Sequence, residues 1–260
     1  MKRAEIALAS IGLAVALAGC GRLDVGSDLL FTSRFETGDF TEWTGLPGGQ
    51  ASAFPMPPNT IAVSTTEAHT GMYAAALTIT TGTDGTQETS QLARTENLPQ
   101  AAYYSAWYYL PRSESVGTFW VVFKFRERTN ATDSSTTAEL YDMDLATLPS
   151  GEMTLQLYDH TTSAAIPLDI PDPVVPVEAW FQLESFYRAA NDDTGRLTFW
   201  LNGQQIFDRA GQPTSPSSWV EWDVASIGED LTPATATLYV DDCAISQSRV
   251  GPNGTLVDPN

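Results

Sequence analysis

The segment GTFWVVFKFRER (residues 117–128) is the starting point for the fold, because apolar and charged side chains alternate over Phe123, Lys124, Phe125 and Arg126 after an apolar run. Successive side chains of a β-strand point to opposite faces of a sheet, so this alternation predicts a strand rather than a helix. The predicted inner face, which would pack in a core, carries Phe119, Val121, Phe123 and Phe125. The predicted outer face carries Trp120, Val122, Lys124, Arg126 and Arg128.

The predicted outer face of this strand is positively charged. Three of the thirteen Lys and Arg residues lie on it, in a chain whose formal net charge is −19. Such a stripe concentrates positive potential on one patch of an acidic molecule. The alternative is that these cations pair with carboxylates on neighbouring strands, because cross-strand charge pairs are common. Both interpretations stay open at the level of sequence.

Short segments with β-strand patterns recur along the rest of the chain, separated by turn residues. Asn202-Gly203 is the strongest hairpin signal among them. In no segment does an apolar repeat of 3.6 residues persist for three turns, so no long helix is expected. The sequence therefore predicts an all-β protein, an antiparallel two-sheet β-sandwich or jelly roll. Strands are expected at residues 60–65, 74–80, 103–110, 117–128, 140–145, 152–160, 180–188, 197–207, 224–228 and 237–246.

The N-terminus predicts export. It begins Met1-Lys2-Arg3 and continues with an apolar run over residues 6–18, which is shorter than the roughly 18 or more residues of a spanning helix. The run ends in Leu17-Ala18-Gly19-Cys20, which resembles the bacterial lipoprotein signal box at all four positions. The resemblance implies diacylglycerol transfer to Cys20, cleavage before it and acylation of the new N-terminus, which together give stable membrane attachment. The alternative is an ordinary signal peptide with a chance cysteine.

The chain is expected to divide into a signal peptide (1–19), a lipidated tether (20–29), a β-sandwich domain (30–250) and a flexible tail (251–260). The expected location is the bacterial cell envelope, at the outer membrane if the cell is Gram-negative. Lipidation uses one of the two cysteines, so Cys243 has no disulfide partner and is expected to be a small buried hydrophobe. The 32 acidic against 13 basic residues argue against nucleic-acid binding, and a monomer is expected.

The order of several segments resembles the concanavalin A-like lectin/glucanase jelly-roll superfamily, particularly its lectin-like, laminin-G-like and polysaccharide-lyase branches. The resemblance spans nearly all of the chain after the signal and implies a jelly roll. It implies no single activity, because such folds host lectins, hydrolases, lyases and adhesion domains. The segments that carry it are FETGDF (35–40), AHTGMYA (68–74), YSAWYYLP (104–111), GRLTFWLNG (195–203) and LYVDDCAI (238–245).

The same resemblance implies a structural calcium ion. Several related carbohydrate-binding modules hold calcium between an acidic residue of the first strand and an aspartate of the last. Similarity maps this site onto Glu36, with Asp39 as a further ligand, and onto Asp241 or Asp242. Calcium prefers several oxygen ligands, which strands from opposite ends of the chain could supply together. The alternative is that these carboxylates cap turns and face water.

Two kinds of sugar-cleaving chemistry can be compared with the sequence. Hydrolysis is disfavoured, because no E-x-D-x-x-E pattern of the kind found in jelly-roll glycoside hydrolases is present. A lyase needs a base for the proton next to a uronate carboxylate, a group that neutralises that carboxylate and an acid for the leaving oxygen. Gln156, Tyr158 and His160 share one face of a predicted strand and, with Lys124 or Arg126, supply these residue types. If the protein is an enzyme, a polysaccharide lyase is therefore favoured.

Binding without chemistry is the preferred interpretation of the sequence. Flat aromatic rings beside a few polar side chains are typical of sugar sites. We predict a surface lipoprotein whose jelly roll binds extracellular or cell-wall polysaccharide. The alternatives are a lyase acting on an acidic glycan, and an adhesion or structural protein with no sugar ligand. The expected ligand-binding residues are Trp120, Lys124, Arg126, Trp107 and Tyr109, with Tyr158, Trp200, Gln156 and Asn191 as further contacts.

Overall fold

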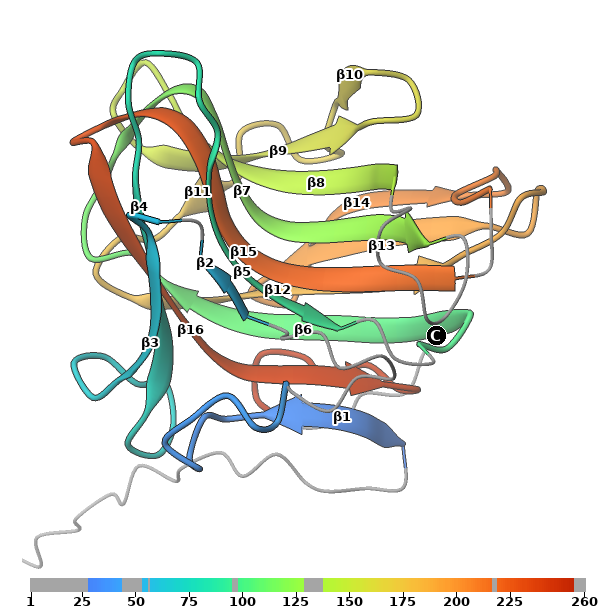
Figure 1. Cartoon of the computed structure of the whole chain (residues 1–260). Helices are drawn as coiled ribbons and strands as arrows, with labels where there is room; N and C mark the ends of the chain where they lie inside the picture. The colour runs from blue at the N-terminus through green and yellow to red at the C-terminus, as the bar shows by residue number, and fades with distance from the viewer. Residues whose placement is uncertain are drawn as a thin grey trace, which may run out of the picture.

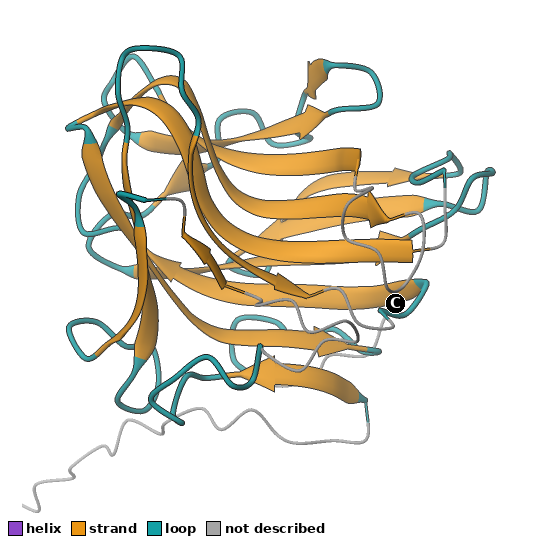
Figure 2. Ribbon diagram, in the orientation of Figure 1, coloured by secondary structure: helices purple, strands orange, loops and turns teal. Residues whose placement is uncertain are grey.

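The computed structural model describes residues 28–43, 53–55, 57–94, 98–128, 138–216 and 219–254. Within these ranges the chain forms strands, turns and loops, and Figure 2 shows no helix. The described part of the chain accordingly contains no helix that is long and apolar enough to cross a membrane. The predicted signal peptide and Cys20 lie outside the described residues.

The described strands form two sheets of eight, and every pairing between neighbours is antiparallel (Figure 1). Sheet A contains β1 (Leu29–Ser33), β3 (Thr60–Ser64), β4 (Ala74–Thr80), β6 (Ala101–Tyr109), β12 (Trp180–Arg188), β13 (Arg196–Leu201), β14 (Gln204–Ala210) and β16 (Thr235–Ser246). Sheet B contains β2 (Ala53–Pro55), β5 (Glu88–Arg94), β7 (Ser115–Arg128), β8 (Ala138–Thr147), β9 (Met153–Asp159), β10 (Ala164–Ile166), β11 (Val174–Val175) and β15 (Trp219–Thr232). The predicted antiparallel two-sheet architecture is confirmed.

The order of strands within each sheet brings together segments that are distant in sequence. Sheet A runs β14-β13-β12-β6-β16-β4-β3, with β1 beside β16, and sheet B runs β10-β9-β8-β7-β15-β5-β2, with β11 beside β9. The hairpin between β13 and β14 turns at Asn202 and Gly203, whose φ angles are 50° and 81°. Positive φ at both central residues is the requirement of a tight two-residue hairpin, so the predicted turn is confirmed.

The hydrophobic core lies between the two sheets and is rich in aromatic rings. Trp222 of β15 is fully buried and contacts Tyr104 of β6 and Phe123 of β7, at ring-centroid distances of 5.5 and 5.7 Å. Buried rings of this kind each remove about 150 to 250 Å² from water and dominate the energetics of such a core. Cys243 of β16 is also fully buried in the core, as expected for a packing residue.

The strand β7 contains an irregularity that exchanges its two faces. On the β8 side Val121 pairs with Asp144, whereas Phe123 pairs with Met143, so one residue is added to the β7 strand between these pairs. Such a bulge shifts the alternation of side chains by one position. Trp120 and Val122 therefore join Phe123 and Phe125 in the core. The predictions that Trp120 and Val122 face outward and that Phe119 and Val121 face the main core are wrong.

Candidate functional site

The candidate site is a cavity on the outer face of sheet B, over the adjacent strands β9, β8, β7 and β15. Its volume is about 420 Å³, within the range typical of small-ligand sites. Polar and apolar side chains both line it, which suits a ligand with a polar and an apolar face. The lining residues are Gln87, Thr118, Phe119, Val121, Lys124, Glu139, Asp142, Asp144, Gln156, Tyr158, His160, Ala165 and Ile227.

The bulge in β7 decides which of its side chains reach the cavity. Phe119 and Val121 precede the bulge and lie with Ile227 of β15 in a small apolar cluster outside the main core. Lys124 follows the bulge and joins the same cavity. Trp120 is fully buried, and its Nε1 donates a hydrogen bond to Ser226 Oγ at 2.9 Å. The prediction that Trp120 presents its ring to a ligand is therefore wrong.

Lys124 lies at the centre of a charged network in the cavity, although the residue is only 3% exposed. Its Nζ lies 2.6 Å from Glu139 Oε1 and 3.7 Å from Asp142 Oδ2. Burial raises the pKa of Glu139, but the charge of Lys124 and its hydrogen bond outweigh this effect and lower the pKa overall. The alternative in which the cations of this strand pair with carboxylates on neighbouring strands therefore holds for Lys124.

The three predicted catalytic residues lie together in the cavity. Gln156 and Tyr158 project from β9 and His160 follows the strand, while the alternating Leu155 and Leu157 point into the core. The ring of Tyr158 lies edge-on to that of His160, with centroids 4.9 Å apart.

A carboxylate partner holds His160 in place. His160 Nε2 lies 2.7 Å from Asp142 Oδ2 and 3.5 Å from Glu139 Oε2. The hydrogen bond with Asp142 raises the pKa of His160 above 6.5, while burial and Lys124 oppose this shift. A histidine whose ring is fixed by a carboxylate has the arrangement of a general base.

Three aspartates on this face have buried carboxyl oxygens without a hydrogen-bond partner among the described residues, and Asp142 is one of them through its Oδ1. Asp144 is 8% exposed, and its Oδ1 is buried without a partner. Burial, followed by the charge of Asp142, raises the pKa of Asp144 to about 7. Asp223 of β15 is fully buried, neither of its carboxyl oxygens has a partner, and burial raises its pKa well above the usual range. A buried carboxyl in this situation is favoured in its neutral form.

Arg126, Trp107 and Tyr109, which were predicted to bind the same ligand, do not line this cavity. Arg126 Nη1 lies 3.1 Å from Glu221 Oε1 on β15. Trp107 and Tyr109 belong to β6 of sheet A, so the structure separates them from Lys124. The ring of Trp107 stacks on His69 at a centroid distance of 3.8 Å, and the ring of Tyr109 contacts Trp180 and Tyr239.

The side chains predicted to hold calcium accept hydrogen bonds from protein groups. Glu36 Oε1 accepts from the backbone N–H groups of Met72 and Tyr73, and Asp241 Oδ2 accepts from those of His69 and Thr70. Asp242 Oδ1 accepts from Arg34 and Thr70, and Asp39 Oδ1 accepts from Thr37 and Thr41. Calcium binding by these residues stays a prediction.

One group of His, Asp and Glu side chains in the described ranges brings three potential ligand atoms within 4.8 Å of one another, and it consists of Glu139, Asp142 and His160. The ammonium of Lys124 already lies against this group, at 2.6 Å from Glu139. We therefore assign Lys124 as the counter-ion of these carboxylates.

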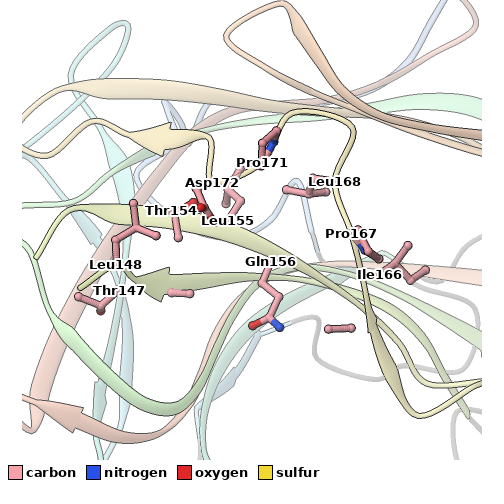
Figure 3. A pocket seen from close by; sticks show the side chains of 12 residues that line it. Thr147, Leu148, Thr154, Leu155, Gln156, Ile166, Pro167, Leu168, Pro171 and Asp172 are labelled. Atoms are coloured by element: carbon pink, nitrogen blue, oxygen red, sulfur yellow. The ribbon is translucent and has the colours of Figure 1, made fainter. Parts of the chain in front are cut away.

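A second cavity of about 460 Å³ adjoins the first, and both are lined by Gln156 and Ala165. Figure 3 shows Thr147, Leu148 and Thr154 on one side of this cavity and Pro167, Leu168 and Pro171 on a loop at the other side. The proline-rich segment at residues 166–177 carries β11 and supplies a wall of this cavity.

No protein-family model and no curated protein sequence matches the chain. Solved structures do match in three dimensions. An endo-β-1,4-glucuronan lyase from the fungus Trichoderma reesei aligns with a TM-score of 0.64 and 12% identity, over 85% of this chain and 97% of the lyase. The cellulose-induced protein Cip1 aligns with a TM-score of 0.54 and 16% identity, over 85% of this chain and 99% of Cip1.

The chain has a jelly-roll β-sandwich fold, which it shares with the glucuronan lyase. The predicted resemblance is thereby confirmed at the level of fold. A carbohydrate esterase from a Shiga toxin-encoding bacteriophage also aligns with this jelly roll, with a TM-score of 0.50 and 12% identity, over 84% of this chain and 98% of the esterase. Proteins of this fold carry different chemistries, so the fold alone does not assign a function.

Proposed function

We propose that this protein is a polysaccharide lyase that cleaves a uronate-containing glycan by β-elimination in the cavity of sheet B. The observation that carries the proposal is that Gln156, Tyr158 and His160 line one cavity of about 420 Å³ together with Lys124. These residue types meet the three needs of the reaction, which are a base, a carboxylate-binding group and a proton donor. The fold shared with a glucuronan lyase supports the proposal.

In the proposed reaction His160 is the base. Its Nε2 faces Asp142 at 2.7 Å, so Nδ1 is the nitrogen that takes the proton next to the substrate carboxylate. The electron pair of the broken C–H bond forms the new C=C double bond. The neighbouring C–O bond breaks with its electron pair on the leaving oxygen, which takes a proton. Tyr158, whose ring contacts His160, has a hydroxyl of the type that can donate this proton.

Binding of a polysaccharide without cleavage is the second candidate function. The observation that favours it is that the Lys124 ammonium is held by Glu139 at 2.6 Å. A lysine engaged in this way neutralises the site's own carboxylates and has less charge to offer a substrate. In this case Gln156, Tyr158 and the apolar side chains of the cavity would contact the sugar, and no bond would break.

One experiment separates the two functions. The mature chain carrying Cys20→Ser is incubated with polyglucuronate, alginate, polygalacturonate and cellulose oligosaccharides, and binding and ultraviolet absorbance are followed together. β-Elimination creates an unsaturated uronate, so a lyase raises the absorbance with at least one uronate polymer. Binding without new absorbance would exclude the lyase and support the binding function. Absence of both signals with every polymer would contradict both proposals.

We also propose that the mature protein is anchored to the cell envelope through Cys20, because residues 17–20 match the lipoprotein signal box. In a Gram-negative host the full chain is expected to incorporate labelled palmitate and to sediment with membranes. Cys20→Ser is expected to lose the label, because it lacks the thiol that takes the acyl-bearing group. Cys243→Ser is the matched control and should keep both properties. Equal labelling of wild type and Cys20→Ser would contradict the anchor.

A further inference from the structure

The cavity is acidic, yet the proposed substrate is an anion. Glu139, Asp142 and Asp144 line it, and the ammonium of Lys124 balances only part of their charge. Like charges repel strongly where water is scarce, so an incoming carboxylate needs a place at which the protein is not negative. Of these three carboxyls, Asp144 is the one that is partly uncharged near neutral pH, so it can provide this place.

Asp144 occupies a distinct position in the cavity. In the antiparallel register of β8 it lies opposite Gln156 of β9 and, on the other side, Val121 of β7. The residue is 8% exposed and lines the cavity, and its Oδ1 is buried without a hydrogen-bond partner among the described residues. An ionised carboxylate in that position would lack the hydrogen bonds that a buried charge requires.

The surroundings of Asp144 set its protonation. Burial and the neighbouring Asp142 and Glu139 on β8 raise its pKa, Lys124 of β7 and His160 after β9 lower it, and the net result is a pKa of about 7. Tyr158 of β9 is the remaining titratable side chain that lines the cavity. A substantial fraction of Asp144 is therefore protonated near neutral pH. A protonated carboxyl is a hydrogen-bond donor, unlike a carboxylate.

We propose that Asp144, as a neutral carboxylic acid, and the side-chain amide of Gln156 together bind the carboxylate of a uronate residue in the cavity. The inference rests on the proposed function and names the group that selects its substrate class. Directly opposed side chains of an antiparallel pair have Cβ atoms about 4.5 to 5.5 Å apart, so the two donors can reach the two oxygens of one carboxylate.

The same contact assists the elimination. When the base removes the neighbouring proton, negative charge develops on the oxygens of the substrate carboxylate before the C–O bond breaks. Hydrogen-bond donors that are already in place stabilise this charge, and an acid kept neutral by its site is a strong donor of this kind. Asp144 keeps its proton through the cycle, so it positions and stabilises the substrate without transferring a proton.

The test measures binding, which does not depend on cleavage. Titration calorimetry with a glucuronate tetrasaccharide is carried out from about pH 5 to about pH 9 on the chain carrying Cys20→Ser and His160→Gln, which removes the proposed base and its titration. The same chain is measured with Asp144→Asn and with Asp169→Asn, an exposed aspartate outside the cavity. With Asp144 intact the affinity is expected to fall by about tenfold per pH unit above about pH 7, because the donor form disappears at that rate. In Asp144→Asn it should stay within about twofold over the same range, because an amide is always a donor.

Two further measurements keep the inference open to contradiction. Cellotetraose, the neutral counterpart of the tetrasaccharide, should bind with no such dependence on pH. Carbon-13 NMR of the Asp144 carboxyl in the wild-type fold should show titration near pH 7 even if Asp144→Asn folds poorly. The binding results and the cleavage assay together separate the two proposals. Uronate binding that depends on Asp144 but never leads to cleavage would support this inference and contradict the lyase.

The opposite results would overturn the inference. Cleavage with an equal pH dependence of binding with Asp144 intact and with Asp144→Asn would leave the lyase standing and reject the role of Asp144. Failure of the tetrasaccharide to bind at any pH would reject it as well. A carboxyl that titrates in the ordinary range near 4 would remove its physical basis.

Discussion

Replacing Lys124 by methionine is expected to lower the free energy of unfolding by about 3 to 5 kcal/mol, the loss usually seen when one partner of a buried ion pair is removed. Lys124 is 3% exposed, and its ammonium lies 3.7 Å from the carboxylate of Asp142, which is 4% exposed. The closer partner, Glu139 at 2.6 Å, has a side chain that is 39% exposed, so the buried partner is Asp142. Methionine preserves much of the volume but leaves the buried carboxylate of Asp142 without its cation. Urea unfolding of the Cys20→Ser chain with and without Lys124→Met, followed by tryptophan fluorescence, measures the difference in the free energy of unfolding.

The stability that Lys124→Met loses, measured as the free energy of unfolding, should increase with pH. Without the ammonium, the pKa values of the neighbouring buried carboxyls rise in the folded chain but not in the unfolded chain. The folded state then binds more protons than the unfolded state, so its stability falls as pH rises from about 5 to about 8. Adding Asp142→Asn to Lys124→Met removes one uncompensated charge and should restore part of the stability.

Arg209→Met provides the matched control for this prediction. Arg209 Nη1 lies 2.7 Å from Asp169 Oδ1, but the two side chains are 43% and 39% exposed. Exposed pairs of this kind contribute about 1 kcal/mol or less, because water screens the charges. A loss in Lys124→Met no greater than that in Arg209→Met would show that the buried network does not stabilise the fold.

The sequence was sufficient to predict most of the long strands, but it missed β5, and it did not give the faces of all the others. The alternation in residues 117–128 correctly predicts a strand with Phe123 and Phe125 in the core. It cannot show the bulge that places Trp120 in the core and Val121 outside, because a bulge depends on the pairing with β8 and β15. On β9 the ladder is regular, and the predicted shared face of Gln156, Tyr158 and His160 is found in the structure.

The site residues that sequence reasoning missed are carboxylates. Asp142 and Asp144 alternate with the buried Tyr141, Met143 and Leu145, so their outward direction was readable from β8 alone. Their role in the site could not be predicted from the sequence, because aspartate and glutamate are common in a chain of this charge. Only the adjacency of β8 to β7 and β9 shows that they meet Lys124 and His160. Strand order is a long-range property, and for the same reason the sequence could not assign Trp107 to the other sheet.

His160→Gln is expected to lower kcat/KM for the uronate substrate by about 10² to 10⁴ fold, the range for loss of a general base. Glutamine keeps a hydrogen-bond donor for Asp142 but cannot accept the substrate proton. A base acts only in its neutral form, so the wild-type rate should rise with pH through the raised pKa of His160. This rising limb should be absent in His160→Gln, and initial rates of absorbance increase across pH measure both effects.

Asp142→Asn and His69→Gln test whether the effect comes from the base itself. The hydrogen bond with Asp142 is the main cause of the raised pKa of His160, so Asp142→Asn should shift the rising limb of the pH profile toward lower pH. His69, the other histidine of the chain, stacks on Trp107 of sheet A, and His69→Gln should leave the rate and the profile unchanged. If His160→Gln retained the wild-type profile at a reduced rate, His160 would only position the substrate, and Tyr158 would become the candidate base.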